Sequence, residues 1–126
     1  MATVVQQETD ERQSVLLDVS NAMVGLYKSL FGRGPTRART SFAGPDVMIC
    51  TLRDTFTPAE RNLAQLGEHQ RLRDTRMFFQ HASESEFRGA VESITGRKTV
   101  AFVSGIDTHA DLACEVFYLE PERHGD

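Results

Sequence analysis

The fold of this chain is decided by residues 31–53, which read FGRGPTRARTSFAGPDVMICTLR. Gly32 predicts the end of a helix, because glycine takes the left-handed conformation of a helix C-cap at little cost, and Pro35 prevents the helix from resuming. Two runs with strand composition follow at residues 36–42 and 47–53, separated by the turn-forming letters AGPD. The stretch therefore predicts a helix that ends at Gly32 and a β-hairpin that follows it.

The residues before Gly32 predict one amphipathic helix. From Ser14 onward, apolar side chains recur at steps of three and four residues, with polar ones between them. The apolar positions are Val15, Val19, Ala22, Met23, Leu26 and Leu30. Residues 1–13 are mostly polar, so we expect a flexible N-terminal segment there.

The two strands of the hairpin differ in composition. Residues 47–53 carry apolar side chains on both faces, which is typical of an inner strand. Residues 36–42 alternate arginine and serine with less polar residues, which favours an edge strand. We therefore expect the second strand inside the sheet and the first at its edge.

Two more helices are predicted after the hairpin. Thr57-Pro58-Ala59-Glu60 is a capping box with proline at the first helical position, so a short helix begins there. A long helix over residues 72–94 is predicted next, with a kink around residues 83–85. Gly96 ends this helix in the same way as Gly32 ends the first.

The chain ends in a second predicted hairpin. Residues 99–103 and 112–119 have strand composition, and the polar residues 104–111 are expected to form the loop between them. A helix, a Gly-Arg pair and a hairpin thus occur twice, with Gly32 and Gly96 in equivalent places. Two alternatives stay open: a structural repeat, or two unrelated helix–hairpin units.

Together these elements predict one α+β domain over residues 14–120. The predicted order is α-β-β-α-α-β-β, with four mostly antiparallel strands and the helices on one face of the sheet. Residues 121–126 are expected to form an acidic tail.

Composition excludes several classes of protein. The chain has 126 residues, one domain's worth, and a net charge of -4, which disfavours a general nucleic-acid binder. No apolar run reaches the ~18 residues of a membrane span, and the N-terminus lacks the pattern of a secretory signal. The two cysteines form no zinc motif. We expect a small, soluble, cytoplasmic domain without cofactor or metal.

Positive charge is concentrated in one segment. Residues 28–53 contain five basic residues and one acidic residue, whereas the rest of the chain is acidic. Arg37 and Arg39 are two positions apart and share one face of their strand. With Arg33 and Gly34 they predict a surface that binds a partner protein or an anion. The alternative is a solvated edge strand whose charge prevents aggregation.

Another set of residues is expected to serve the structure alone. Arg76 falls near the apolar stripe of the long helix, so its guanidinium needs an internal partner, for which we predict Glu60. The full set of predicted structural residues is Gly32, Pro35, Thr57, Glu60, Arg76 and Gly96.

Catalytic and metal-binding signals are weak. Asp107, His109 and Asp111 stand at two-residue spacing and could share a face around a divalent ion, but no further ligand is evident, and such residues are common in turns. No nucleophile stands out with its base. We therefore expect no metal site and no enzyme activity.

A set of motifs resembles a known bacterial family. The residues are Phe31-Gly32-Arg33-Gly34-Pro35-Thr36, Thr57-x-x-Glu60, Arg76, Thr95-Gly96-Arg97 and Val116-Phe117-Tyr118-Leu119, in that order. They resemble the MpsC-like family, named after the C component of a Na⁺-translocating membrane-potential-generating system, over residues 14–120. The resemblance implies a companion of membrane proteins of sodium or bicarbonate uptake, or a regulatory protein. It carries over no catalytic or ligand-binding residue.

These observations lead to two hypotheses about function. We expect a non-enzymatic accessory or regulatory protein that docks on a membrane transporter subunit or on a soluble regulatory protein, and that forms a homodimer through a free sheet face or edge. The alternative is a nucleic-acid or small-anion-binding domain that uses the face of Arg33, Arg37 and Arg39. The absence of tryptophan disfavours single-stranded nucleic acid, because base stacking needs aromatic platforms.

Overall fold

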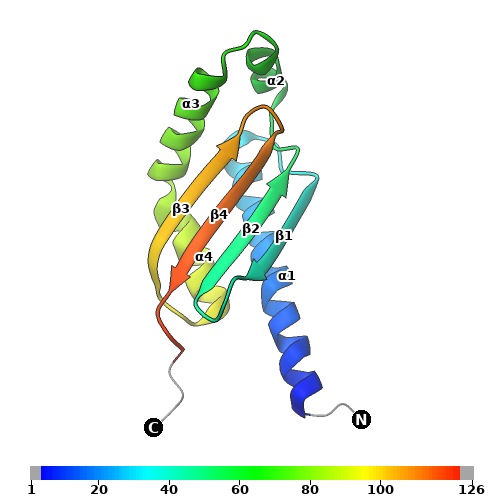
Figure 1. The fold of residues 1–126 in the computed structure, drawn as a ribbon, viewed down its shortest axis with the longest axis vertical. Coiled ribbons are helices and arrows are strands. Elements are labelled where there is room, and N and C mark those ends of the chain that lie inside the picture. Colours follow the sequence, from blue (N-terminus) through cyan, green and yellow to red (C-terminus); the bar gives the residue numbers. More distant parts are fainter. Residues whose placement is uncertain (1–3, 123–126) are drawn as a thin grey trace.

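The computed structural model describes residues 4–122 as a four-stranded antiparallel sheet with helices behind one face (Figure 1). In chain order the elements are α1 (Val4–Phe31), β1 (Arg37–Phe42), β2 (Val47–Arg53), α2 (Pro58–Gln65), α3 (His69–Ala82), α4 (Glu84–Thr95), β3 (Thr99–Asp107) and β4 (Leu112–Leu119). The predicted α+β class is confirmed.

The order of the strands is β1-β2-β4-β3, with every neighbouring pair antiparallel. The prediction of an inner second strand and an edge first strand is confirmed. Figure 1 looks onto the face of the sheet that the helices leave uncovered, while α1 and α4 lie behind the strands. We call the helix-covered side the inner face and the other side the outer face.

The first helix begins earlier than predicted. α1 starts at Val4, whereas the apolar periodicity placed its start at Ser14 and left residues 1–13 as a flexible segment. The side chains from Gln7 to Ser14 are exposed, so no burial marks this part of the helix. Glutamate, glutamine and arginine are good helix formers, and they extend the helix beyond the part that packs on the sheet. Residues 1–3 lie outside the described residues, as do residues 123–126 of the expected acidic tail.

The long helix predicted over residues 72–94 is two helices. α3 already begins at His69 and ends at Ala82, and α4 begins at Glu84. Ser83 leaves the helical conformation, with φ −108° and ψ 14°. The predicted kink is therefore a complete break, and the element order contains one helix more than expected.

The third strand is longer than predicted. Residues 104–111 were expected to form a loop, but β3 continues to Asp107. Ser104 lies opposite Glu115, and Gly105 lies opposite Cys114. Pairing of Ser104 and Gly105 with β4 therefore outweighs the tendency of a Ser-Gly pair to form a turn. Only residues 108–111 form the turn.

The hydrophobic core lies between the inner face and the helices. Fully buried side chains from α1, α4, β2 and β4 meet there, and burying each contributes about 1.5–3 kcal/mol. They include Val19, Met23, Phe87, Val91, Met48, Leu52 and Phe117.

The two helix–hairpin units occupy equivalent places in the sheet. β2 and β4 form the antiparallel centre, β1 and β3 are the edges, and α1 contacts α4 behind them. Gly32 and Gly96 both have positive φ, 76° and 70°. This arrangement favours the structural repeat over two unrelated units.

Candidate functional site

The Gly-Arg-Gly-Pro-Thr segment lies between α1 and the first hairpin. Its Arg33 side chain contacts residues that follow the hairpin. The Arg33 guanidinium donates to the backbone oxygens of Asp54 and Phe56 at 2.7 and 2.8 Å, and it pairs with the Asp54 carboxylate at 2.9 Å. These contacts hold the pKa of Asp54 below its ordinary value. Arg97 plays a similar part after α4, where it donates to the backbone oxygen of Glu120. Arg33 and Arg97 thus hold the residues that directly follow β2 and β4, respectively.

Gly34 allows a close approach between backbone segments. A Cβ atom at this position would lie 3.2 Å from Cγ1 of Val24 on α1. The contacts of Arg33 and Gly34 agree with the structural interpretation of this segment. The predicted binding role of these residues stays a prediction.

Arg37 and Arg39 lie on the outer face, as their spacing predicted, and Arg53 joins them. Arg37 is directly opposite Arg53 on β2, and Arg39 is opposite Thr51. All these arginines are exposed, and within residues 4–122 no carboxylate forms an ion pair with any of them. We call Arg37, Arg39 and Arg53 the arginine corner. Like charges directly opposite each other are unfavourable, so the corner is an electrostatic cost that an anionic partner would relieve.

An apolar strip borders the arginine corner on the outer face. Ile49, Val116 and Val103 are in register across β2, β4 and β3. Val103 is 54% exposed, and the nearby Tyr118 is 42% exposed. No helix of the described chain covers this side of the sheet (Figure 1). The outer face therefore combines free positive charge with exposed apolar area.

The predicted structural residues form a buried ion pair behind the sheet. Thr57 and Glu60 make the capping box, and the Glu60 carboxylate also accepts from Arg76 at 2.6 and 2.8 Å, as predicted. Arg76 is completely buried and donates to the backbone oxygen of Thr55 as well. Its guanidinium lies 4.0 Å from the centre of the Phe31 ring. Despite burial, Arg76 and the cap hold the pKa of Glu60 below its ordinary value.

A row of polar side chains crosses the inner face and was not predicted. Thr40, Cys50, Glu115 and Ser104 lie opposite one another on β1, β2, β4 and β3. Glu115 is completely buried in this row. A signal was present, because Glu115 stands two residues from Phe117 and therefore shares its face. The row could not be read from the sequence, since it depends on the register of all the strands.

Two helices close over Glu115. The Tyr27 hydroxyl on α1 donates to Glu115 Oε1 at 2.6 Å, and Gln80 Nε2 on α3 donates to the same oxygen at 3.1 Å. Burial is the main cause that raises the pKa of Glu115 to about 7, and burial together with Glu115 raises the pKa of Tyr27. Three oxygens of this cluster are buried without a hydrogen-bond partner: Glu115 Oε2, Gln80 Oε1 and Ser104 Oγ.

A pocket lies beside two of these residues, Gln80 and Ser104, between α3 and β3. It has a volume of about 200 Å³, and its lining includes both Gln80 and Ser104. The rest of the wall is formed by Met77, His81, Glu84, Phe102 and Val103.

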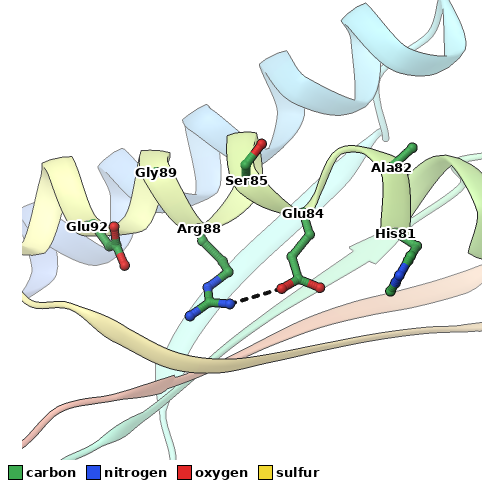
Figure 2. A pocket seen from close by; sticks show the side chains of 7 residues that line it. All are labelled: His81, Ala82, Glu84, Ser85, Arg88, Gly89 and Glu92. Carbon is green, nitrogen blue, oxygen red and sulfur yellow. Dashed lines mark hydrogen bonds and ion pairs between the residues drawn. The ribbon is translucent and has the colours of Figure 1, made fainter.

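A wider depression of about 590 Å³ adjoins it along α4 (Figure 2). Figure 2 shows His81, Glu84, Arg88 and Glu92 on one side of the helices, with an ion pair from Arg88 to Glu84 at 2.9 Å. Arg88 and Glu92 also hold Thr99 at the start of β3. Because these side chains bond to one another and to β3, the depression offers few free polar groups to a ligand.

The residues considered for a metal site serve the turn between β3 and β4. Asp107 accepts from the backbone nitrogens of His109 and Ala110, whereas Asp111 accepts from the backbone nitrogens of Thr55 and Phe56. Within residues 4–122, no group of three histidine, cysteine or acidic side chains could hold a metal ion.

Comparison with known proteins identifies the family. In the described part of the chain, no helix has the length and apolar character needed to cross a membrane. No curated protein and no solved structure matches the chain. Residues 11–121 match the family described as the Na⁺-translocating membrane potential-generating system (MpsC). This match spans most of the chain, and the protein therefore belongs to the MpsC family.

Proposed function

We propose that this protein is a non-enzymatic accessory component of a Na⁺-translocating membrane system and that it docks on a membrane subunit through its outer face. Family membership supports the association with such a system. The observation that carries the docking is the arginine corner, because Arg37, Arg39 and Arg53 are exposed, close together and free of ion pairs in the described chain. The protein acts from the cytoplasmic side, and a link to bicarbonate uptake belongs to the same proposal.

Charge complementarity defines the partner surface. The only acidic side chain that the strand register places on the outer face of the described sheet is Asp107, opposite Leu112. The outer face of a second copy therefore offers too little negative charge for three arginines. An acidic protein surface with an apolar centre would pair with the corner and cover the strip of Ile49, Val103 and Val116. Homodimerisation stays a prediction, which light scattering on the purified protein tests.

The experiment compares the wild-type protein with two double variants during affinity purification from solubilised membranes of the native host. Arg37→Glu/Arg39→Glu reverses the arginine corner. Lys28→Glu/Arg71→Glu is the matched control, because both side chains are exposed on helices and the net charge changes equally. Circular dichroism and thermal melts check that all the proteins are folded.

We expect a membrane subunit to co-purify with the wild type and with the control, and to be reduced at least tenfold with Arg37→Glu/Arg39→Glu. Mass spectrometry then identifies the subunit as part of an ion-translocating system. Equal recovery with the corner variant contradicts docking through this face. Recovery of nucleic acid in place of a membrane protein, lost at raised salt, replaces the proposal with the nucleic-acid alternative.

A further inference from the structure

The cluster around Glu115 contains a buried carboxyl group without a counterion. Arg76 on α3 acts on Glu115 electrostatically, but its charge is matched by Glu60 at 2.6 Å. Within residues 4–122 no cationic side chain pairs with Glu115. A buried carboxylate without a partner is strongly disfavoured, so Glu115 either holds a proton or meets a cation from outside the chain.

Three oxygens in the cluster around Glu115 lack a hydrogen-bond partner. One carboxylate oxygen is saturated by Tyr27 and Gln80, whereas Glu115 Oε2 has no partner. Gln80 is 1% exposed and turns its nitrogen toward Glu115, so its own Oε1 is unpartnered. Ser104 is the cross-strand neighbour of Glu115, and its hydroxyl lies close enough to lower the pKa of Glu115, although Ser104 Oγ has no partner within regular hydrogen-bond geometry.

The chemistry of these atoms selects a class of ligand. A carboxylate, an amide oxygen and a hydroxyl are hard ligands that favour hard metal cations over softer transition metals. One carboxylate balances one positive charge, and the positive field of Arg76, which lowers the pKa of Glu115, disfavours a second charge. The 200 Å³ pocket borders Gln80 and Ser104 but not Glu115 itself, so a cation would approach the buried carboxylate past these two neighbours.

We propose that Glu115, Gln80 and Ser104 form a binding site for a monovalent metal cation, entered through the pocket between α3 and β3. Water that fills the pocket completes the coordination. The site lies on the inner face, so it is independent of docking through the outer face, and either proposal can fail without the other.

Protons compete with the cation in this site. The titratable and charged groups that face Glu115 are Tyr27 from α1, Arg76 from α3 and Cys50 from β2. His81 and Glu84 stand in the wall of the pocket. Because a proton and a cation cannot both occupy the free oxygen of Glu115, cation binding weakens as the pH falls.

The test measures the thermal midpoint of the purified protein in NaCl, KCl and choline chloride at equal ionic strength. Above the pKa of Glu115, we expect Na⁺ or K⁺ to raise the midpoint by about 4–6 °C over choline at ten times the dissociation constant. Glu115→Gln removes this difference, and it should fold well because it keeps an acceptor for Tyr27. Glu86→Gln is the matched control, since Glu86 is exposed on α4 and outside the pocket wall.

Two further measurements separate binding from a general salt effect. Ser104→Ala removes one ligand and should raise the dissociation constant about tenfold, which is roughly 1.4 kcal/mol. The chain has two tyrosines and no tryptophan, so the fluorescence of a Tyr118→Phe background reports on the Tyr27–Glu115 bond. This fluorescence should change with Na⁺ or K⁺ but not with choline. Equal midpoints in all three salts, or a difference that Glu115→Gln retains, would overturn the proposal.

Discussion

Arg76 is the largest side chain that the core buries completely. Its guanidinium donates hydrogen bonds to Glu60 and to the backbone oxygen of Thr55, and it lies over the ring of Phe31. The sequence predicted this pair because a cation on an apolar stripe requires an internal partner. Glu115 is as buried as Arg76 but has no countercharge, whereas Glu60 is partly exposed and paired with Arg76. This difference explains why the pKa of Glu115 rises while that of Glu60 falls.

We expect Arg76→Met to lower the free energy of unfolding by about 3–5 kcal/mol, because it leaves Glu60 buried without its partner. Glu60→Gln added to this variant should restore at least about 1 kcal/mol, since glutamine keeps the capping box and carries no charge. Urea denaturation of both single variants and the double variant measures this coupling. Additive losses would show that the ion pair does not stabilise the fold.

At the level of secondary structure, α1 and α4 end at glycines in the left-handed conformation, Gly32 and Gly96. Gly96 has φ 70° at the end of α4, and a Cβ atom there would meet no neighbour within 4 Å. The cost of a side chain at this position is therefore conformational alone. The sequence also predicted the start of α2, because a capping box satisfies helix-end donors locally. The start of α1 at Val4 was not predicted, because exposed helix formers leave no apolar signal.

We expect Gly96→Ala to lower the free energy of unfolding by about 1–2 kcal/mol, the cost of alanine in the left-handed conformation. Gly89→Ala is the matched control within α4, where the added Cβ again meets nothing within 4 Å. This control should raise the free energy of unfolding by about 0.5–1 kcal/mol, because alanine favours the helix interior. Chemical denaturation measures both variants. Equal effects of the same sign would contradict the assigned backbone conformations.

For the whole molecule, the sheet separates two kinds of surface. The inner face holds the core and the polar row of Thr40, Cys50, Glu115 and Ser104. The outer face holds the arginine corner and the apolar strip, which no helix of the described chain covers. The arginines proposed for docking and the ligands proposed for the ion are therefore different residues on opposite sides of the sheet, and Val103 borders both the apolar strip and the pocket.

Stability should depend on pH through Glu115. Burial raises the pKa of Glu115 in the folded protein from 4.5 to about 7, so between these values the folded state binds a proton that the unfolded state releases. The free energy of unfolding should therefore fall by about 3 kcal/mol as the pH rises through this window, and level off above it. Urea denaturation in choline buffer measures this slope. Glu115→Gln should abolish it, and an unchanged slope in that variant would assign the effect to another group.

Several features could be predicted from local sequence signals: the helix ends at Gly32 and Gly96, the capping box of Thr57, the pair of Arg76 and Glu60, and the two hairpins. These features depend on residues close in the chain or on a charge that burial must satisfy. The length of β3, the place of Arg53 beside Arg37 and Arg39, and the cluster around Glu115 depend instead on how the strands pair. Tyr27 and Gln80 reach Glu115 across 88 and 35 residues of chain. Local periodicity shows which face a side chain occupies, but the strand register decides which distant side chains meet there.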